Sequence, residues 1–359
     1  MKFNQLTKVA ALVLTTLACY GANAASNGVA VSINPAKAVL QSHEDVLINV
    51  KITNNSGADQ LVLKWYTPFS DSAEGLFDVY RDGVKVDYVG AHYKRAAPTA
   101  SDYFLLKAGK SYNQKVELSA LYDMSVTGNY TVRYRTGTLD LFASNGSQGI
   151  AGGSKSVGEL NSEVVAMWIN GRQNALASAS PSPAPLASLA GSLSTVSCTS
   201  SRTSAITTAV SGAKSYSSGA LSYLNAGTKG PRYTSWFGTY DATRYSTVKA
   251  HYNSILSAFN NQAVSVSCAC TKSVYAYVYP TQPYKIYVCN AFWTAPATGT
   301  DSKAGTLVHE MSHFNAVAAT DDWAYGHSAA KSLAISSPTK AVDNADSHEY
   351  FAENTPAQN

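Results

Sequence analysis

The sequence predicts two domains of different class: an all-β, sandwich-like domain over residues 25–172 and an α+β, mainly helical domain over residues 196–359. Three observations support this prediction. The first half alternates apolar and polar residues in short runs that end in Asn, Asp and Gly turns. The second half spaces its apolar residues as helices do. Between them, residues 173–195 are rich in Pro, Ala and Ser, which is typical of an exposed linker.

The first 24 residues are predicted to be a secretion signal and not part of the fold. A short, positively charged N-terminal region precedes the apolar run Val9–Leu17, and Ala22-Asn23-Ala24 forms an A-x-A cleavage site. The run is too short to span a bilayer, which needs about 20 residues, and no later stretch is long enough. We therefore expect a secreted, extracellular protein with no membrane association. The alternative is a lipid attached to Cys19, although Thr16 occupies the position where a lipoprotein signal has leucine.

The charge of the chain argues against nucleic acid as a partner. Charged residues make up 14% of the chain and the formal net charge is +4. Both halves carry a small positive excess, whereas phosphate binding needs a basic patch or stripe. Hydrophobic residues make up 45%, which is ordinary for a globular protein and excludes wholesale disorder.

The N-terminal domain is predicted to consist of short alternating strands, at residues 29–33, 46–52, 61–65, 77–80, 112–118 and 130–134. Turn residues follow two of them, at 54–57 and 81–83. Such a series is typical of a β-sandwich. His43 and His92 lie far apart in the sequence and lack metal-ligand spacing, so we interpret them as solvated side chains.

The C-terminal domain is predicted to be mainly helical. Residues 200–224 and 246–259 carry apolar residues at helical spacing. Within residues 273–289, aromatic residues occupy alternate positions on both sides of a turn that contains prolines, which predicts a hairpin. A further helix is expected to begin with Asp301 or Ser302 as its N-cap.

Four cysteines remain once the signal is removed: Cys198, Cys268, Cys270 and Cys289. An even number in an exported chain predicts two disulfides. Cys268 and Cys270 alternate on an apparent strand, so they face opposite sides and are not expected to pair with each other. The spacing does not fit a usual zinc site. The residues alone leave the choice between the other pairings open.

The most informative motif is H-E-x-x-H at His309–His313. On a helix, residues four apart share a face, so His309 and His313 can bind one tetrahedral Zn²⁺. Glu310 lies beside them and can take a proton from a water that attacks a peptide carbonyl. The chain has only 7 histidines, so a chance match is a rare event. The motif predicts a zinc-dependent peptidase.

A catalytic zinc site also needs a third protein ligand. Residues 318–327 follow the motif and offer Asp321, Asp322 and His327. By chemistry alone, each of the three is a candidate ligand. Tyr325 lies three residues after Asp322 and could donate its hydroxyl to a developing oxyanion.

This stretch resembles the deuterolysin family of aspzincins, whose pattern is H-E-x-x-H followed by G-T-x-D-x-x-Y-G. Thr320, Asp322, Tyr325 and Gly326 match the second part, whereas Ala319 replaces its first glycine. The resemblance covers about residues 196–359, including the four cysteines. It implies a zincin-like metalloprotease domain with one zinc ion, and the disulfides Cys198–Cys268 and Cys270–Cys289.

The resemblance also assigns roles within the motif. It implies that His309, His313 and Asp322 are the zinc ligands. Glu310 would be the general base of a zinc-activated hydrolysis, and Tyr325 would donate a hydrogen bond in the transition state.

Within this family the sequence is most similar to the peptidyl-lysine metalloendopeptidases. The shared stretches lie at residues 231–238, 291–293, 299–302 and 344–351. In the last stretch, Asp346 and Glu349 are three residues apart and share a face if the segment is helical. The resemblance implies that they line a pocket for the residue after the scissile bond, so that cleavage occurs on the amino side of lysine. The alternative is a pair of solvated acids at a helix N-terminus.

We expect a monomeric preproenzyme that acts on protein or peptide substrates, with residues 25–172 as a propeptide that serves as chaperone and inhibitor. Two alternatives stay open: a deuterolysin-like protease of broader specificity, and a β-domain adhesin or binding module with an appended protease. Lys94-Arg95 is one possible plug for an acidic pocket, although a solvated loop is the simpler interpretation. No lysine lies between Lys155 and Lys214, so a strictly lysine-specific enzyme could not process its own linker.

Overall fold

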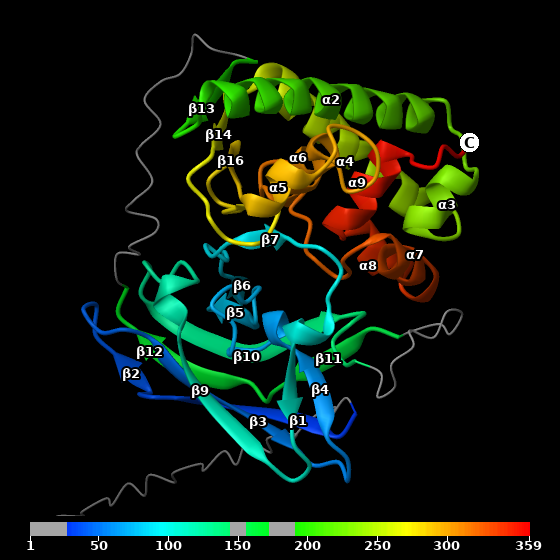
Figure 1. Cartoon of the computed structure of the whole chain (residues 1–359). Coiled ribbons are helices and arrows are strands. Elements are labelled where there is room, and N and C mark those ends of the chain that lie inside the picture. The colour runs from blue at the N-terminus through cyan, green and yellow to red at the C-terminus, as the bar shows by residue number, and fades with distance from the viewer. Residues whose placement is uncertain (1–26, 144–155, 172–190) are drawn as a thin grey trace, which may run out of the picture.

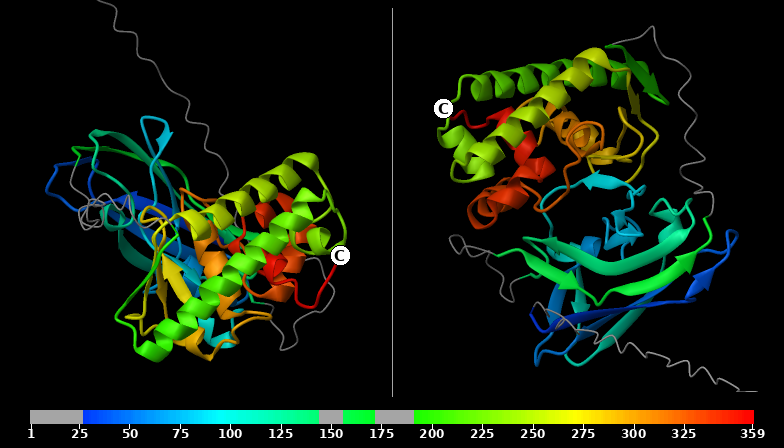
Figure 2. Two further views of the ribbon diagram at one scale, coloured as in Figure 1. Left: turned by 90° about the horizontal axis from the view of Figure 1, so that it is seen from above. Right: turned by 180° about the vertical axis from the view of Figure 1, so that it is seen from behind.

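The computed structural model describes residues 27–143, 156–171 and 191–359. The predicted signal at residues 1–24 and most of the predicted linker lie outside these ranges. The chain forms a β-rich N-terminal domain and a mainly helical C-terminal domain, which lie against each other (Figures 1 and 2). The predicted division into a β-rich and a helical half is therefore confirmed.

Two sheets and a strand pair make up most of the N-terminal domain. One sheet has the order β1-β3-β9, a larger one has β2-β12-β10-β5-β6 with β11 paired to β10, and β4 pairs with β8. The elements are β1 (Val29–Pro35), β2 (Val39–Leu40), β3 (Leu47–Asn54), β4 (Gln60–Leu63), η1 (Lys64–Tyr66), β5 (Phe77–Arg81), β6 (Val84–Lys85), β7 (His92–Lys94), η2 (Ala100–Asp102), β8 (Tyr103–Leu106), β9 (Ser111–Glu117), η3 (Leu118–Ala120), β10 (Gly128–Thr138), β11 (Gly158–Asn161) and β12 (Val165–Ile169).

Alternation along these strands produces the core, because successive side chains point to opposite faces of a sheet. In β3, Ile48, Val50 and Ile52 are buried, and the two residues between them, Asn49 and Lys51, are exposed. In β10 of the larger sheet, Tyr130 and Val132 are buried in the same hydrophobic cluster. The two sheets thus share one core, as in a sandwich.

Helices surround a small sheet in the C-terminal domain. The elements are β13 (Leu193–Val196), α2 (Ser200–Asn225), α3 (Pro231–Phe237), α4 (Ala242–Asn261), β14 (Val264–Ser267), β15 (Ala276–Val278), β16 (Lys285–Val288), α5 (Asn290–Thr294), α6 (Lys303–His313), α7 (His327–Ser336), α8 (Pro338–Val342) and α9 (Ala345–Glu353). The long helices α2 and α4 lie side by side over the sheet and α6 (Figure 1). The predicted hairpin is present, since β15 and β16 pair antiparallel. β13 begins inside the predicted linker region and pairs with β14.

The sheet of the C-terminal domain is completed by a strand of the N-terminal domain. Its order is β13-β14-β16-β15-β7, and β7 pairs antiparallel with β15, with Lys94 opposite Ala276 and His92 opposite Val278. Figure 1 and the right view of Figure 2 show β7 between the two domains. The interpretation of residues 91–97 as a solvated loop is therefore wrong for this segment.

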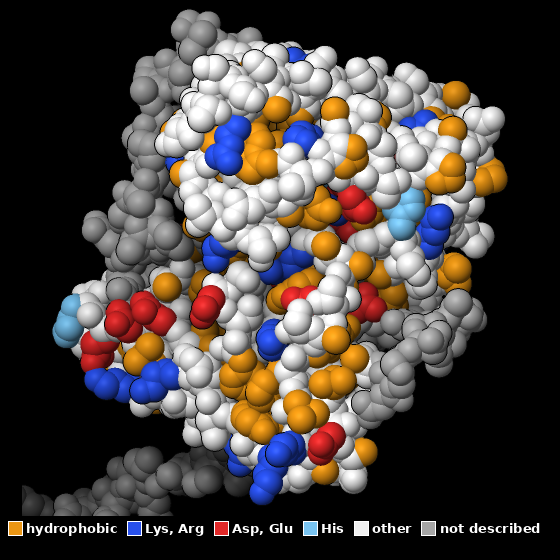
Figure 3. Space-filling model, in the orientation of Figure 1, with side chains coloured by type: hydrophobic (Ala, Val, Ile, Leu, Met, Phe, Trp, Pro, Cys, Tyr) orange, Lys and Arg blue, Asp and Glu red, His pale blue; other side chains and the backbone are white. Residues whose placement is uncertain are grey.

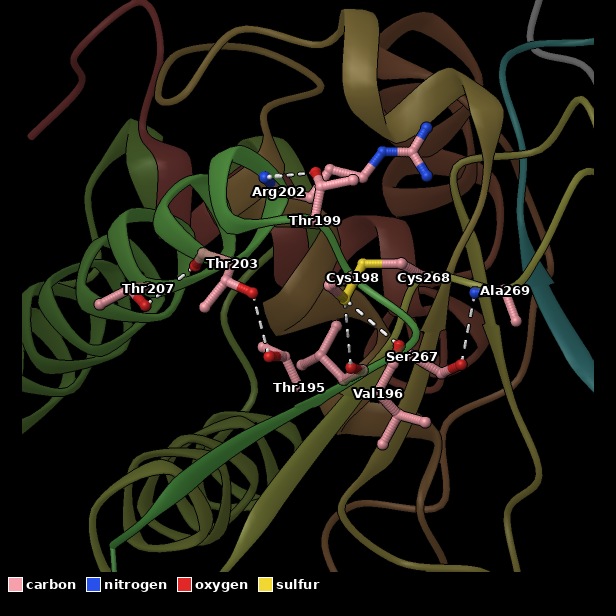
Figure 4. Close-up of a disulfide and its surroundings, with 11 residues drawn as sticks. Thr195, Val196, Cys198, Thr199, Arg202, Thr203, Thr207, Ser267, Cys268 and Ala269 are labelled. Atoms are coloured by element: carbon pink, nitrogen blue, oxygen red, sulfur yellow. Dashed lines mark hydrogen bonds between the residues drawn. A yellow bond between two sulfur atoms is a disulfide. The ribbon is translucent and has the colours of Figure 1, made fainter.

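Two disulfides connect parts of the C-terminal domain. Figure 4 shows Cys198, which precedes the N-cap of α2, joined to Cys268, which follows β14. The second disulfide joins Cys270 to Cys289 at the end of β16. Both pairs are those that the family resemblance implies. Thr199 caps α2 by accepting a hydrogen bond from the Arg202 amide, as Figure 4 also shows.

Basic and acidic side chains are interspersed over the face in Figure 3, and no continuous basic stripe crosses that face. No helix within the described ranges combines the length and the apolar character that a membrane crossing needs.

Candidate metal centre and specificity pocket

Helix α6 carries the H-E-x-x-H motif through the interior of the molecule. Ser302 is its N-cap, because its side chain accepts a hydrogen bond from the Gly305 amide at 2.9 Å. The Ser302 amide and hydroxyl in turn donate to Glu353 Oε1 at 2.9 and 2.8 Å. Of the two expected caps, Ser302 serves this role. The contact with Glu353 fixes the start of α6 against α9.

The two motif histidines converge with Asp322. His309 Nε2 and His313 Nε2 are 3.0 Å apart. Asp322 Oδ1 is 3.5 Å from His309 Nε2, and Asp322 Oδ2 is 3.5 Å from His313 Nε2. All three side chains are buried. Helical spacing brings the two imidazoles together, and the loop after α6 supplies the carboxylate.

Contacts at the other ring nitrogen, Nδ1, orient both imidazoles. His313 Nδ1 lies 2.7 Å from the Thr320 carbonyl oxygen, to which it donates. His309 Nδ1 lies 2.9 Å from Asp346 Oδ1. A histidine that donates from Nδ1 leaves the Nε2 lone pair free to bind a metal. Burial lowers the pKa of His313 well below its usual value, which also favours the neutral ligand form.

The donor set fits zinc. Within the described ranges, neither carboxylate oxygen of Asp322 has a hydrogen-bond partner, although both are buried. A buried carboxylate without a partner is costly, and a divalent cation between Asp322 and the two imidazoles would remove that cost. Two imidazoles and one carboxylate are a common ligand set for catalytic zinc.

The other two candidates for a third ligand lie elsewhere. The side chain of Asp321 is 53% exposed. His327 starts α7 and packs against the rings of Trp236 and Tyr350, at centroid distances of 4.7 and 4.3 Å. Ala319, which replaces a glycine of the family pattern, has a φ of 50°. This left-handed conformation explains why glycine suits that turn.

Glu310 lies next to the candidate metal ligands, and one of its carboxylate oxygens is free of hydrogen bonds within the described residues. Its Oε1 accepts a hydrogen bond from the Lys94 amide at 3.3 Å. Its Oε2 is buried and has no hydrogen-bond partner in the part of the chain that the structure describes. Burial, reinforced by the Asp322 carboxylate, raises the pKa of Glu310 well above its usual value. Glu310 therefore has a raised affinity for a proton.

Tyr325 is held by the N-terminal domain. Its hydroxyl donates to Glu74 Oε1 at 3.1 Å, and its ring lies edge-on to Trp65 at a centroid distance of 5.3 Å. Tyr66 also reaches across the boundary and donates to the backbone carbonyl oxygen of Asp322. A cavity of about 550 Å³ lies at this boundary, with Glu74 and Asp322 among its lining residues.

A buried acidic pocket lies beside His309, and Lys94 fills it. Lys94 Nζ is 2.6 Å from Asp346 Oδ1 and 2.8 Å from Glu349 Oε2, and all three side chains are fully buried. Burial lowers the pKa of Lys94, but the two carboxylates outweigh it and raise the pKa well above its usual value. The burial of Asp346 and Glu349 contradicts the alternative of solvated helix-terminal acids.

Comparisons with known proteins identify the family of this chain. The family model described as lysine-specific metallo-endopeptidase, of the aspzincins, matches residues 222–353. An extracellular protease of Aeromonas hydrophila is 45% identical over 320 residues, which is 89% of this chain and 90% of the relative. This chain belongs to the aspzincin family of zinc metalloendopeptidases.

Two further relatives of this chain are named as a peptidyl-Lys metalloendopeptidase and a zinc peptidase. A peptidyl-Lys metalloendopeptidase of Grifola frondosa is 41% identical over 281 residues, covering 77% of this chain and 76% of the relative. A solved zinc peptidase from the same organism is 53% identical, with a TM-score of 0.44, and covers 45% of this chain and 100% of its own. The match to the Aeromonas protease is longer than the C-terminal domain, so similarity between these aspzincins extends into the β-rich domain.

The aspzincin structure brings together the residues that the motif and the family resemblance indicated. It adds Glu74 and His92, which sequence reasoning did not place at the site. The interpretation of His92 as a solvated side chain is wrong, because it is buried and its ring stacks on His313 at a centroid distance of 4.8 Å. The only feature of the sequence that pointed to residues 92–95 as part of the site was the Lys94-Arg95 pair, because an acidic pocket attracts a lysine side chain.

Proposed function

We propose that this aspzincin is a secreted zinc endopeptidase, made as a preproenzyme, that cleaves peptide bonds on the amino side of lysine. The observation that carries the proposal is the Lys94 ammonium, buried between Asp346 and Glu349 beside the metal ligands. A compact ammonium with three donors suits two carboxylates. The backbone amide of Lys94 is at the same time within 3.3 Å of Glu310.

The metal would be held by His309, His313 and Asp322. Zinc in this position would supply Lewis-acid chemistry, polarising the peptide carbonyl and lowering the pKa of a water molecule. The fixed Nδ1 contacts of both histidines would keep their Nε2 atoms directed at it. Asp322 would add the negative charge that offsets part of the charge of the cation.

Glu310 would be the general base. Its free Oε2 could accept a proton from the attacking water. A leaving nitrogen placed where the Lys94 amide lies, within 3.3 Å of Oε1, could then receive that proton from Glu310. Tyr325, once its hydroxyl is released from Glu74, would donate to the oxyanion. One such donor typically contributes about 10²–10³ in rate.

Asp346 and Glu349 would select lysine. Burial raises the pKa of Glu349 to about 8, whereas Lys94 and His309 hold the pKa of Asp346 below its usual value despite its burial. An incoming lysine ammonium would therefore meet at least one buried carboxylate. An uncharged side chain would leave that charge unpaired in the interior, at a cost of several kcal/mol.

The β-rich domain would act as the inhibitory propeptide. β7 adds to the edge strand β15 of the C-terminal domain, which is how extended peptides bind to an exposed sheet edge. Because the same segment fills the pocket and reaches Glu310, a substrate cannot bind until β7 leaves. This arrangement supports the propeptide role over that of an independent binding module.

The test is to map cleavage sites in a mixture of denatured proteins by mass spectrometry, with the secreted enzyme and with a chelator-treated sample. We expect new N-termini that begin with lysine, lost with the chelator and regained with added zinc. Cleavage at many bonds that are not followed by lysine would favour the broader, deuterolysin-like specificity. Cleavage that continues in the chelator would exclude a zinc mechanism.

A further inference from the structure

We propose that Glu74 is a latch that keeps the Tyr93–Lys94 peptide bond intact in the active site of the precursor, and that this bond becomes a self-cleavage site once the latch is lost. The inference rests on the proposed function, because it uses the preference for lysine. It adds a specific bond and a specific controlling residue, both in the N-terminal domain.

The Tyr93–Lys94 bond lies where a scissile bond would lie. The side chain of Lys94 occupies the acidic pocket, with Nζ 2.6 Å from Asp346 Oδ1. Its amide nitrogen, which belongs to the bond on the amino side of this lysine, is 3.3 Å from Glu310 Oε1. Pairing with β15 on both sides of the bond fixes the register of the backbone. The segment is therefore bound as a substrate would be.

Glu74 contacts residues on both sides of this bond. Its Oε2 is 3.4 Å from His92 Nδ1, and its Oε1 accepts from Arg95 Nε and Nη2 at 3.2 and 2.8 Å. Arg95 also donates from Nη1 to Ser72 Oγ at 3.3 Å, which ties it to the same loop. Glu74 is 3% exposed. One buried carboxylate thus bridges the residues that flank Tyr93–Lys94, and would hold both ends in place if the bond were cut.

The same carboxylate also occupies Tyr325. Because the Tyr325 hydroxyl donates to Glu74 Oε1 at 3.1 Å, it cannot donate to an oxyanion on the Tyr93 carbonyl at the same time. Loss of one oxyanion donor slows acyl transfer by about 10²–10³. Glu74 therefore opposes hydrolysis in two ways. It keeps the Tyr325 hydroxyl from donating to the oxyanion, and it would keep the new ends at Tyr93 and Lys94 close enough to rejoin.

The reaction that the latch prevents is an ordinary hydrolysis. Water adds to the Tyr93 carbonyl carbon, the C–N bond to Lys94 breaks, and Glu310 carries a proton from the water to the Lys94 nitrogen. The products are a carboxylate on Tyr93 and a new amino terminus at Lys94. The step consumes one water and needs no other reactant.

The experiment compares full-length precursors loaded with zinc and followed by intact mass and N-terminal sequencing. In Glu74→Gln the carboxylate charge is removed while the side-chain volume is kept. We expect this variant to be cut at Tyr93–Lys94 at least about 100-fold faster than wild type, giving a fragment that begins Lys94-Arg95-Ala96. The double variant Glu74→Gln/Glu310→Gln should stay intact, which would identify the cut as self-cleavage.

A matched control is Glu159→Gln, which removes a different carboxylate at the domain boundary, the partner of Lys340. Its Tyr93–Lys94 bond should stay as intact as in wild type. Equal cutting rates in wild type and Glu74→Gln, or an uncut Glu74→Gln chain, would overturn the latch. A reporter peptide with one lysine is given to the processed enzyme as a further control. If the enzyme cuts the reporter before its lysine while Glu74→Gln stays uncut, the latch is wrong and the proposed function stands.

A second measurement covers the case in which Glu74→Gln does not fold. A synthetic peptide of residues 90–98 carries the Tyr93–Lys94 bond without Glu74. We expect the processed enzyme to cut this peptide at that bond, as it does the reporter. A peptide that resists while the reporter is cut would mean that the bond is protected by its own sequence, and would overturn the role of Glu74.

Discussion

Asp346 contacts more than the lysine in its pocket. Its Oδ1 is 2.6 Å from Lys94 Nζ and 2.9 Å from His309 Nδ1, while its Oδ2 accepts from the Gly326 amide at 2.6 Å. Carboxylates that hold a metal-bound histidine in this way tune its orientation and basicity. A change at Asp346 should therefore disturb the metal centre as well as the pocket. Glu349 is the more selective probe of specificity.

The first prediction compares these two carboxylates. Glu349→Gln should lower kcat/KM for lysine substrates through KM, because its interaction with the substrate side chain is equal in the ground and transition states. Asp346→Asn should in addition weaken zinc binding by about 10–100-fold. Steady-state kinetics and zinc titration test this difference. Equal zinc affinities in the two variants would contradict a role of Asp346 in holding His309.

The second prediction concerns the third ligand. Asp322→Ala should lose zinc, because it removes the carboxylate that lies 3.5 Å from both imidazoles. Asp321→Ala is the matched control and should keep zinc, because the Asp321 side chain is half exposed to solvent. Metal analysis after gel filtration measures the zinc content. The reverse pattern would refute the assignment.

Single residues also show where prediction from the sequence stops. The spacing of His309 and His313 was enough to predict a shared face, because helical geometry is local. The choice between Asp321 and Asp322 depended on the family pattern, since two adjacent acids in a loop look alike. The burial of His92 could not be predicted, because a pair of interacting domains creates its environment.

At the scale of elements, the two disulfides constrain different lengths of chain. Cys198–Cys268 joins residues 70 apart and ties the start of α2 to the end of β14. Cys270–Cys289 joins residues 19 apart. A disulfide restricts the unfolded chain, and the longer loop loses more entropy.

The third prediction follows from these loop lengths. Replacing Cys198 and Cys268 together by serine should lower the free energy of unfolding by about 4 kcal/mol, and replacing Cys270 and Cys289 by about 3 kcal/mol. Denaturant unfolding of both double variants measures these values. A larger loss for the shorter loop would show that native packing around the cysteines outweighs chain entropy.

The elements that were predicted best have a strong local pattern. The helices at 200–225 and 242–261 and the hairpin strands are present close to their expected bounds. β7 was not predicted, because His92-Tyr93-Lys94 forms a strand only by pairing with β15 of the other domain. Three residues carry too little alternation to be recognised without that partner.

At the scale of the whole molecule, β7 would be a competitor for the active site, carried by the precursor that we propose. A tethered segment has an effective concentration in the millimolar range, far above micromolar substrate. β7 should therefore exclude substrate almost completely while the N-terminal domain is attached and intact. Glu74 and Lys94 both belong to the N-terminal domain.

The fourth prediction is that the intact precursor cleaves a large substrate about 10²–10³ times more slowly than the processed enzyme. Lys94→Met should raise precursor activity, because the change removes the cation that holds β7 to Asp346 and Glu349 and so favours departure of β7. Lys107→Met, which changes an exposed lysine of the same domain, is the control and should have no effect. A wild-type precursor as active as the processed form would remove the inhibitory role.

The most direct test of the zinc peptidase mechanism is to measure zinc content and turnover together in Glu310→Gln. This change removes the proton acceptor and leaves His309, His313 and Asp322 in place. We predict one zinc per processed enzyme, as in wild type, with turnover of a lysine reporter lowered by at least about 10²-fold. Near wild-type turnover with zinc bound would contradict the role of Glu310 as general base and, with it, the mechanism proposed for this aspzincin.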